Sequence, residues 1–324
     1  MHFSTMPTSR PVDPPCFQVD GRFLTSPDGS RVILRGVNEM FVWGDRTGNA
    51  LEEISRTGAN CIRLVWTLAE GTAQELDALL ERCAGLGMLP IAEFHDATGK
   101  WEELDAVVSG WLRPDYLAVT KKHQGRLVLN IGNEVGEEVT DSDFAAAYSD
   151  ALRRLRQAGI RCPLMIDAAF WGQDYGLLSR TGSALVHSDP LKNVLLSVHM
   201  WWPAKNSGGS LESAAQRVMD ALADAQSKGL PLVVGEFGAA FTEAGEVLDP
   251  DRIAWQTILE ECHGREIGWL AWSWGGVPNQ PQKDLDMTRD GRFETLYGWG
   301  REVALDHPFS IARTASPIEW LRNR

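Results

Sequence analysis

Short apolar runs alternate with longer amphipathic stretches along most of the chain. Near-continuous hydrophobic runs of this length are typical of strands that are buried on both faces of a parallel sheet. Each run ends in polar or aromatic residues, and the predicted strands are Val32–Asn38, Cys61–Trp66, Leu89–His95, Arg126–Glu134, Pro163–Ala169, Val194–Trp201, Pro231–Gly238 and Ile267–Trp274.

The stretches between these runs carry apolar residues at spacings of three and four, which predicts helices. The connection after Ala169 is weaker, and its helix is expected to be broken around Gly182. Proline is favoured in the first turn of a helix, so Pro250 is expected to begin the last of the clearly predicted helices. The clearest helices are predicted at Thr72–Gly87, Asp141–Gly159, Ser210–Gly229 and Pro250–Gly264.

Eight strands that alternate with helices fit either an open doubly wound sheet or a closed barrel. A doubly wound nucleotide-binding sheet normally has a glycine-rich phosphate loop after its first strand, and residues 36–39 do not form one. The count of eight therefore predicts an α/β fold, a single (β/α)8 TIM barrel. A short β-hairpin from Phe17 to Val32, turning at Asp28-Gly29, precedes it. One domain is expected over residues 16–324, after a flexible segment at 1–15.

Composition and charge exclude several classes of partner. A net charge of −13 argues against nucleic acid or an anionic membrane as the main partner, because both bind basic surfaces. No apolar stretch reaches the roughly 18 residues of a membrane span, and residues 1–15 lack the apolar core of a secretory signal. The chain is therefore expected to be cytoplasmic, or secreted with its signal already removed. Five scattered cysteines suggest neither a zinc site nor a disulfide framework.

Thirteen tryptophans against four tyrosines are the one unusual feature of the composition. They are explained equally well by core filling and by carbohydrate binding, since the apolar face of a sugar stacks on an indole ring.

Polar residues gather where the predicted strands end. Active sites of barrels lie at these ends, and an unpaired charge buried there would cost several kcal/mol. The polar side chains must therefore pair with one another or serve a site. They are Asn38, Glu39, Arg63, Glu93, His95, Asn133, Glu134, Asp167, His199, Trp201, Glu236, Trp272 and Trp274.

Two of these carboxylates suggest a reaction. Glu134 ends the fourth predicted strand and Glu236 the seventh, on opposite sides of an eight-stranded barrel. Two carboxyl groups that face each other across the barrel mouth are what a glycosidase needs, one as proton donor and one facing the anomeric carbon. A structural salt bridge is the alternative for either residue alone.

With these motifs in place, the chain resembles glycoside hydrolase family 5 of clan A, and within it the bacterial endo-β-1,4-mannanases. The His-Asp-Ala-Thr-Gly and Asp-Ala-Ala-Phe-Trp-Gly-Gln segments point to mannanases in particular. The matching segments span most of the chain and lie at 35–38, 57–65, 93–99, 130–134, 167–173, 197–200, 235–238 and 268–274.

The resemblance implies a role for each residue. Glu134 is expected to act as general acid and then base, and Glu236 as the nucleophile. Arg63 is expected beside Glu236, where it would keep that carboxylate ionised. Asn133 is expected to hold the sugar 2-hydroxyl.

The remaining site residues are expected to bind sugar. His95 and His199 would bind hydroxyls and orient the carboxylates, although a purely structural role is the alternative for either histidine. Trp272 would stack under the sugar at the point of cleavage. Glu93 and Asp167 are expected to be ion-pair partners rather than substrate contacts.

Two positions depart from the family. An aromatic residue usually follows the acid, and here Val135 does; a tyrosine usually lies two residues after the strand-six histidine, and here Trp201 does. An indole N–H donates a hydrogen bond but cannot accept one or ionise. Trp201 is expected on the site side of its strand, either donating to Glu236 or stacking on sugar.

The predicted function is a retaining, monomeric glycoside hydrolase that cleaves β-1,4-mannosidic bonds in mannan or manno-oligosaccharides and needs no cofactor or metal. An exo-acting β-mannosidase and a β-1,4-glucan-directed relative are the alternatives among enzymes. A non-catalytic barrel that only binds glycans is the alternative of another class.

Overall fold

Eight parallel strands close into a barrel, in the order β10-β11-β4-β5-β6-β7-β8-β9. In this computed structural model, residues 15–241, 247–275 and 285–322 are described. The predicted TIM barrel is therefore confirmed, while the segment expected to be flexible lies outside the described residues except for Pro15. The barrel strands are β4 (Arg35–Glu39), β5 (Cys61–Trp66), β6 (Leu89–Phe94), β7 (Val128–Asn130), β8 (Leu164–Asp167), β9 (Val194–His199), β10 (Leu232–Glu236) and β11 (Gly268–Ala271).

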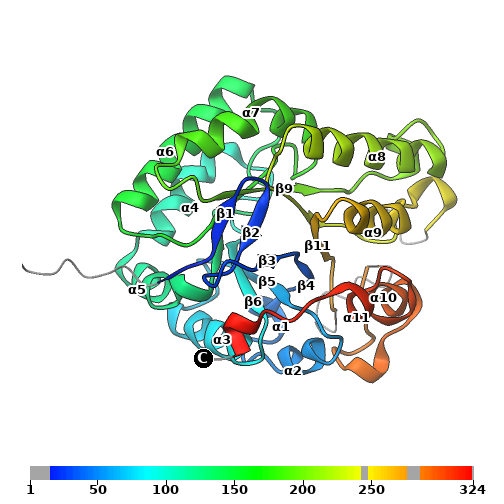
Figure 1. The fold of residues 1–324 in the computed structure, drawn as a ribbon, viewed down its shortest axis with the longest axis horizontal. Helices are drawn as coiled ribbons and strands as arrows, with labels where there is room; N and C mark the ends of the chain where they lie inside the picture. Colours follow the sequence, from blue (N-terminus) through cyan, green and yellow to red (C-terminus); the bar gives the residue numbers. More distant parts are fainter. Residues whose placement is uncertain (1–14, 242–246, 276–284, 323–324) are drawn as a thin grey trace, which may run out of the picture.

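The helices form a ring around the strands (Figure 1). Side chains of Thr72, Thr140, Asp174 and Ser210 each accept a backbone N–H at the start of a helix, which fixes where α3, α6, α7 and α8 begin. The helices are α1 (Phe41–Gly44), α2 (Ala50–Ser55), α3 (Ala73–Gly85), α4 (Leu104–Trp111), α5 (Pro114–His123), α6 (Asp141–Gln157), α7 (Tyr175–Ser188), α8 (Leu211–Ser227), α9 (Trp255–Gly264), α10 (Gly298–Arg301), α11 (Ile311–Thr314) and α12 (Glu319–Arg322). None of the helices in the described ranges is both long and apolar enough to cross a bilayer.

Two helix predictions need correction. Helix α7 runs unbroken through Gly182. A Cβ at this position would lie 2.4 Å from Leu196 Cδ1 of β9, so the glycine allows the helix to pack closely on the strand. Helix α9 begins at Trp255, since Asp249-Pro250-Asp251 form a separate 3-10 turn.

The N-terminal segment closes one end of the barrel. It forms three antiparallel strands, β1 (Gln18–Asp20), β2 (Phe23–Thr25) and β3 (Arg31–Val32), rather than the single predicted hairpin. A second turn at Gly21, which has a φ of 60°, adds the extra strand. Its apolar side chains pack on residues from the first half of the barrel strands, and this layer crosses the centre of the barrel in Figure 1. The other end is left open.

Gly36 tests how tightly the barrel closes. A Cβ at this position would lie 2.1 Å from the backbone oxygen of Cys61, so Gly36→Ala would force β4 away from β5. We expect a loss of about 3 kcal/mol in the free energy of unfolding, measured by denaturant titration of tryptophan fluorescence. Gly264→Ala is the control, because a Cβ at the end of α9 meets no atom within 4 Å. Equal stability of the two variants would contradict the tight packing at Gly36.

Candidate active site

The two glutamates lie at the open end of the barrel. Glu236 is the last residue of β10. Glu134 is not at a strand end as predicted, because β7 stops at Asn130 and Glu134 lies in the following loop with a φ of 46°. Two backbone bonds hold that loop: the Glu134 N–H donates to Asp167 Oδ2 at 3.1 Å, and the Glu134 carbonyl accepts from the Gly99 N–H at 2.9 Å.

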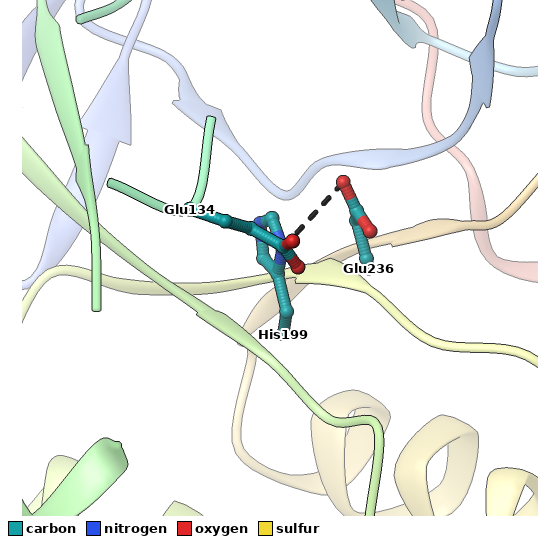
Figure 2. Close-up of side chains that lie close together, drawn as sticks. All are labelled: Glu134, His199 and Glu236. Atoms are coloured by element: carbon teal, nitrogen blue, oxygen red, sulfur yellow. Dashed lines mark hydrogen bonds and ion pairs between the residues drawn. The ribbon is translucent and has the colours of Figure 1, made fainter. Parts of the chain in front are cut away.

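The carboxyl groups are close because their strands are not opposite each other. Only β8 and β9 separate β7 from β10 in the barrel, which corrects the expectation of diametrically placed strands. One carboxyl oxygen of Glu134, one of Glu236 and a ring nitrogen of His199 all lie within 4.8 Å of one another (Figure 2). This is shorter than the separation of about 6.5–9.5 Å between the carboxyl groups of inverting glycosidases.

Arg63 of β5 lies beneath both carboxylates and is fully buried. Its Nη1 donates to Glu236 Oε1 at 2.8 Å, and its Nη2 lies 3.3 Å from Asp167 Oδ2. Burial lowers the pKa of the guanidinium, but the charges of Glu93, Asp167 and Glu236 outweigh burial and raise it. Arg63 is therefore the fixed positive charge of the site. Its other donors reach the amide oxygens of Asn38, Asn130 and Asn133.

Asp167 of β8 links this charge to the loop that carries Glu134. Its Oδ2 accepts the Glu134 N–H and faces Arg63, and its Oδ1 accepts from Asn130 Nδ2 at 3.1 Å. Burial raises the pKa of this carboxyl, but His199 and Arg63 outweigh burial and hold it well below the usual range. Asp167 is fully buried and outside the cavity described below, as expected for an ion-pair partner.

His199 of β9 lies between the two glutamates. Its Nδ1 is 2.7 Å from Glu134 Oε1 and 3.5 Å from Glu236 Oε1, and its Nε2 is 3.4 Å from Asp167 Oδ2. Burial lowers the pKa of the imidazole, but the surrounding carboxylates outweigh burial and raise it to about 10. Glycines leave room for the ring, since a Cβ at Gly172 would lie 2.6 Å from its Cγ and one at Gly235 would lie 2.9 Å from its Nε2.

The register of β9 and β10 also brings His199 to the nucleophile candidate. Val234 pairs with Val198, yet Glu236 rather than Gly235 pairs with His199, because the register shifts between Val234 and Glu236. This irregularity places Glu236 and His199 side by side at the strand ends.

The environment of Glu134 favours its protonated form. Burial raises its pKa first, and the negative charge of Glu236 raises it further, while His199 partly opposes both. Its side chain keeps 11% exposure, so it remains within reach of the cavity. A carboxyl group whose surroundings raise its pKa, close to a second carboxyl group, is the arrangement that acid catalysis of glycoside cleavage uses.

Trp201 donates its indole N–H to Glu236 Oε2 at 3.1 Å. Glu236 thus receives one hydrogen bond on each oxygen, from Arg63 and from Trp201. Gly238 makes space for the larger ring, because a Cβ there would lie 2.8 Å from Trp201 Cζ3. Of the two positions predicted for the indole, the structure has the donor.

A cavity of about 520 Å³ lies over the carboxylates. Its wall includes the predicted residues His95, Trp201 and Trp272. Arg63, Asn133 and His199 are fully buried beneath it, and their direct contact with substrate stays a prediction. Among the described residues, the lining consists of His95, Glu134, Phe170, Trp171, Gln173, Trp201, Asn206, Glu236, Phe241, Trp272 and Leu285.

His95 and Asn133 support each other under this cavity. His95 Nδ1 is 2.9 Å from Glu93 Oε1, and Asn133 Nδ2 is 3.3 Å from His95 Nε2 and 2.9 Å from Thr98 Oγ1. Burial lowers the pKa of His95, but Glu93 outweighs burial and raises it.

The sequence interpretation missed part of the cavity wall. Val135, which replaces the aromatic residue expected after the acid, is buried and does not line the cavity. The aromatic wall near Glu134 comes instead from Phe170 and Trp171. These two lie in the Asp-Ala-Ala-Phe-Trp-Gly-Gln segment that carried the resemblance, whereas no sequence signal marked Phe241.

Glu134, His199 and Glu236 are also the group among the described residues whose atoms are close enough to hold a metal ion. The guanidinium of Arg63, with Nη1 at 2.8 Å from Glu236 Oε1, already supplies a positive charge to this group. The donor set therefore fits proton transfer better than metal binding.

The pKa of His199 leads to a test of stability. Because this pKa is raised from about 6.5 in the unfolded chain to about 10, protonation stabilises the fold fully below pH 6.5, and that contribution is lost as the pH rises toward 10. We therefore expect the difference in free energy of unfolding between wild type and His199→Gln to shrink steadily across this pH window. His187→Gln, at an exposed position on α7, is the matched control. A difference that does not change with pH would contradict a protonated His199.

Comparison with known proteins agrees with this geometry. Residues 25–277 match the model of the family described as Cellulase (glycosyl hydrolase family 5). The chain is 34% identical over 297 residues to the mannan endo-1,4-beta-mannosidase of Salipaludibacillus agaradhaerens, covering 89% of this chain and 90% of that protein. It is 33% identical over 288 residues to the enzyme of the same name from Streptomyces lividans, covering 85% of this chain and 70% of that protein.

Among solved structures, the beta-mannanase from Streptomyces thermolilacinus superposes with a TM-score of 0.83 at 28% identity, over 94% of this chain and 99% of that one. The same enzyme with mannohexaose gives a TM-score of 0.82 over 94% of this chain and 98% of that one. The family model covers well over half of the chain, and the curated relatives exceed 30% identity over most of its length. This chain belongs to glycosyl hydrolase family 5.

Proposed function

We propose that this chain is a retaining endo-β-1,4-mannanase in which Glu134 is the acid/base and Glu236 the nucleophile. The observation that carries the proposal is the contrast between two close carboxyl groups. Glu134 is in surroundings that favour its proton, and Glu236 accepts an N–H donor on each oxygen.

The first half of the reaction uses both groups at once. Glu236 attacks the anomeric carbon and forms a glycosyl ester as the bond to the leaving oxygen breaks. Glu134 gives its proton to that oxygen, so the leaving sugar departs as a neutral alcohol. Arg63 and Trp201 hold Glu236 in position for attack.

The second half restores the enzyme. Glu134, now a carboxylate, takes a proton from water, and the resulting hydroxide oxygen attacks the anomeric carbon from the face that the leaving group vacated. The ester bond breaks and Glu236 regains its charge. Two displacements at one carbon give net retention.

The substrate class rests on the relatives. Three curated relatives are named mannan endo-1,4-beta-mannosidase, and solved relatives include complexes with mannohexaose and mannotriose. A further relative, from Caldicellulosiruptor saccharolyticus, is named beta-mannanase/endoglucanase A, which keeps a glucan-directed activity as the second candidate. Product profiles on mannan, cellulose, xyloglucan and short manno-oligosaccharides separate mannan from glucan preference and endo from exo action. The proposal takes residues 16–324 as one monomeric catalytic domain that uses no cofactor.

Substitution of the two glutamates tests their roles. We expect Glu134→Gln to lower kcat/KM on mannohexaose by about 10²–10⁴-fold, because the leaving oxygen loses its proton donor. The dinitrophenolate of a dinitrophenyl mannobioside leaves without being protonated. The formation of the glycosyl ester from this substrate should therefore persist in Glu134→Gln but not in Glu236→Gln.

The control for this pair is Glu260→Gln, on the exposed side of α9, which should leave both rates unchanged. The assignment would be reversed if Glu236→Gln, rather than Glu134→Gln, kept activity on the dinitrophenyl substrate.

Trp201→Phe tests the hydrogen bond that replaces the family's tyrosine. The change keeps an aromatic ring and removes the donor to Glu236 Oε2. A hydrogen bond to a charged group contributes about 1.5–3 kcal/mol, so we expect kcat on mannohexaose to fall by roughly tenfold or more with little change in KM.

Trp320→Phe is the control, because Trp320 packs at the opposite, closed end of the barrel. A change confined to KM would show that Trp201 acts by stacking on sugar instead of by donating.

A further inference from the structure

A carboxyl group on the outer face of the barrel is buried under the loop that follows β11. Glu39 is the last residue of β4 and is 2% exposed. Its neighbour Asn38 accepts a hydrogen bond from Arg63 inside the barrel. Successive side chains of a strand point to opposite faces, so Glu39 points outward. It therefore lies apart from the arginine network beneath the two glutamates of the active site.

The loop after β11 is attached to β4 at two successive residues. The Trp274 N–H donates to Asn38 O at 3.0 Å, and the Gly275 N–H donates to Glu39 Oε2 at 3.1 Å. The first bond joins two backbone groups, whereas the second depends on the glutamate side chain. Glu39 thus supplies a side-chain anchor for the loop.

The anchored loop carries two residues of the cavity wall. Trp272 and Leu285 both line the active-site cavity. Backbone bonds join their two segments, since the Ser273 N–H donates to Leu285 O at 3.2 Å and the Met287 N–H donates to Ser273 O at 2.9 Å. A displacement of Gly275 would therefore move both segments, and with them the wall against which a sugar would lie.

A second buried carboxyl group packs against the anchored glycine. Gly275 has a φ of 85°, and a Cβ at this position would lie 2.7 Å from the Cβ and 2.8 Å from the Oδ1 of Asp286. Asp286 is 7% exposed and follows Leu285 in the same loop. The side chains of Glu39 and Asp286 therefore meet at one glycine, where neither a larger residue nor a displaced loop would fit.

The surroundings of Glu39 favour its neutral, protonated form. Burial raises its pKa, and the bond from the Gly275 N–H partly opposes burial. The negative charges of Asp45, which follows α1, and of Asp286 raise the pKa further. A protonated carboxyl group still accepts the loop N–H, so the anchor does not require a charge.

The arginines of the neighbouring elements are directed elsewhere, and none of the described cations forms an ion pair with Glu39. Arg63 of β5 lies inside the barrel, and Arg35 at the start of β4 donates to backbone oxygens. Arg46, which follows α1, pairs with two other glutamates, and Arg313 of α11 is exposed. An unpaired buried charge is strongly disfavoured, which again favours the neutral acid.

We propose that Glu39 is a positioning residue for sugar binding, which as a neutral acid holds the loop after β11, and with it Trp272 and Leu285, against β4. The inference rests on the proposed function only in taking mannohexaose as the ligand of the active-site cavity. Sugar binding, rather than bond cleavage, is the step that depends on Glu39, because its contacts reach the cavity wall and not the two glutamates.

Two substitutions of Glu39 test this role. Glu39→Ala removes the acceptor of the Gly275 N–H, whereas Glu39→Gln keeps an oxygen acceptor and carries no charge. We expect Glu39→Ala to raise KM on mannohexaose by about two- to tenfold, as loss of one hydrogen bond predicts, with little change in kcat. Glu39→Gln should restore most of this loss. Glu260→Ala, on the exposed side of α9, is the matched control.

Melting temperatures test the neutral acid without any substrate. Because the folded pKa of Glu39 is raised above the value of about 4.3 in the unfolded chain, its contribution to stability is complete below that pH and is lost as the pH rises. We therefore expect the Tm of Glu39→Gln to increase relative to that of wild type as the pH is raised above this value. Glu260→Gln is the matched control.

An unchanged KM in Glu39→Ala, a loss confined to kcat, or an equal loss in Glu39→Gln would overturn the positioning role. A Tm difference between Glu39→Gln and wild type that is the same at every pH would overturn the neutral acid. A wild-type enzyme that does not cleave mannohexaose would instead overturn the proposed function, and the melting temperatures would still decide the state of Glu39.

Discussion

A fully buried arginine is the constraint on which the active site depends. The guanidinium of Arg63 has no contact with water, so its donors must find acceptors inside the barrel. It finds them on residues from β4, β7, β8, β10 and the loop after β7, so one side chain joins β5 to four other barrel strands. Removing one partner of a buried ion pair costs about 3–5 kcal/mol, so the same contacts that order the carboxylates also resist their displacement.

The carboxylates around this arginine are kept in different states by their surroundings. Asp167 faces two cationic side chains and stays ionised, whereas Glu134 is buried beside another carboxylate and favours its proton. His199 bonds to Glu134 and carries a positive charge, which limits how far that pKa rises. An acid and a nucleophile candidate therefore coexist within 4.8 Å because each has different neighbours.

Neighbouring residues compensate for the two positions, Trp201 and Val135, at which the chain departs from its family. Trp201 is larger than tyrosine, and the missing Cβ of Gly238 gives its ring room to reach Glu236. Val135 turns into the core, and the aromatic wall beside the acid is supplied from the loop after β8 by Phe170 and Trp171.

The sequence by itself determined the barrel and the set of polar residues that gathers at its open end. Buried parallel strands require continuous apolar runs, so all eight strands were readable, although the fourth ends at Asn130 rather than at Glu134. The resemblance already implied that Arg63 and Trp201 lie beside Glu236. The number of strands between the two glutamates and the register shift at Glu236 were decided by the tertiary structure. The unbroken helix at Gly182 and the wall formed by Phe170 and Phe241 also depended on tertiary contacts. A sequence period shows which face is buried, but only the packed structure decides what lies against it.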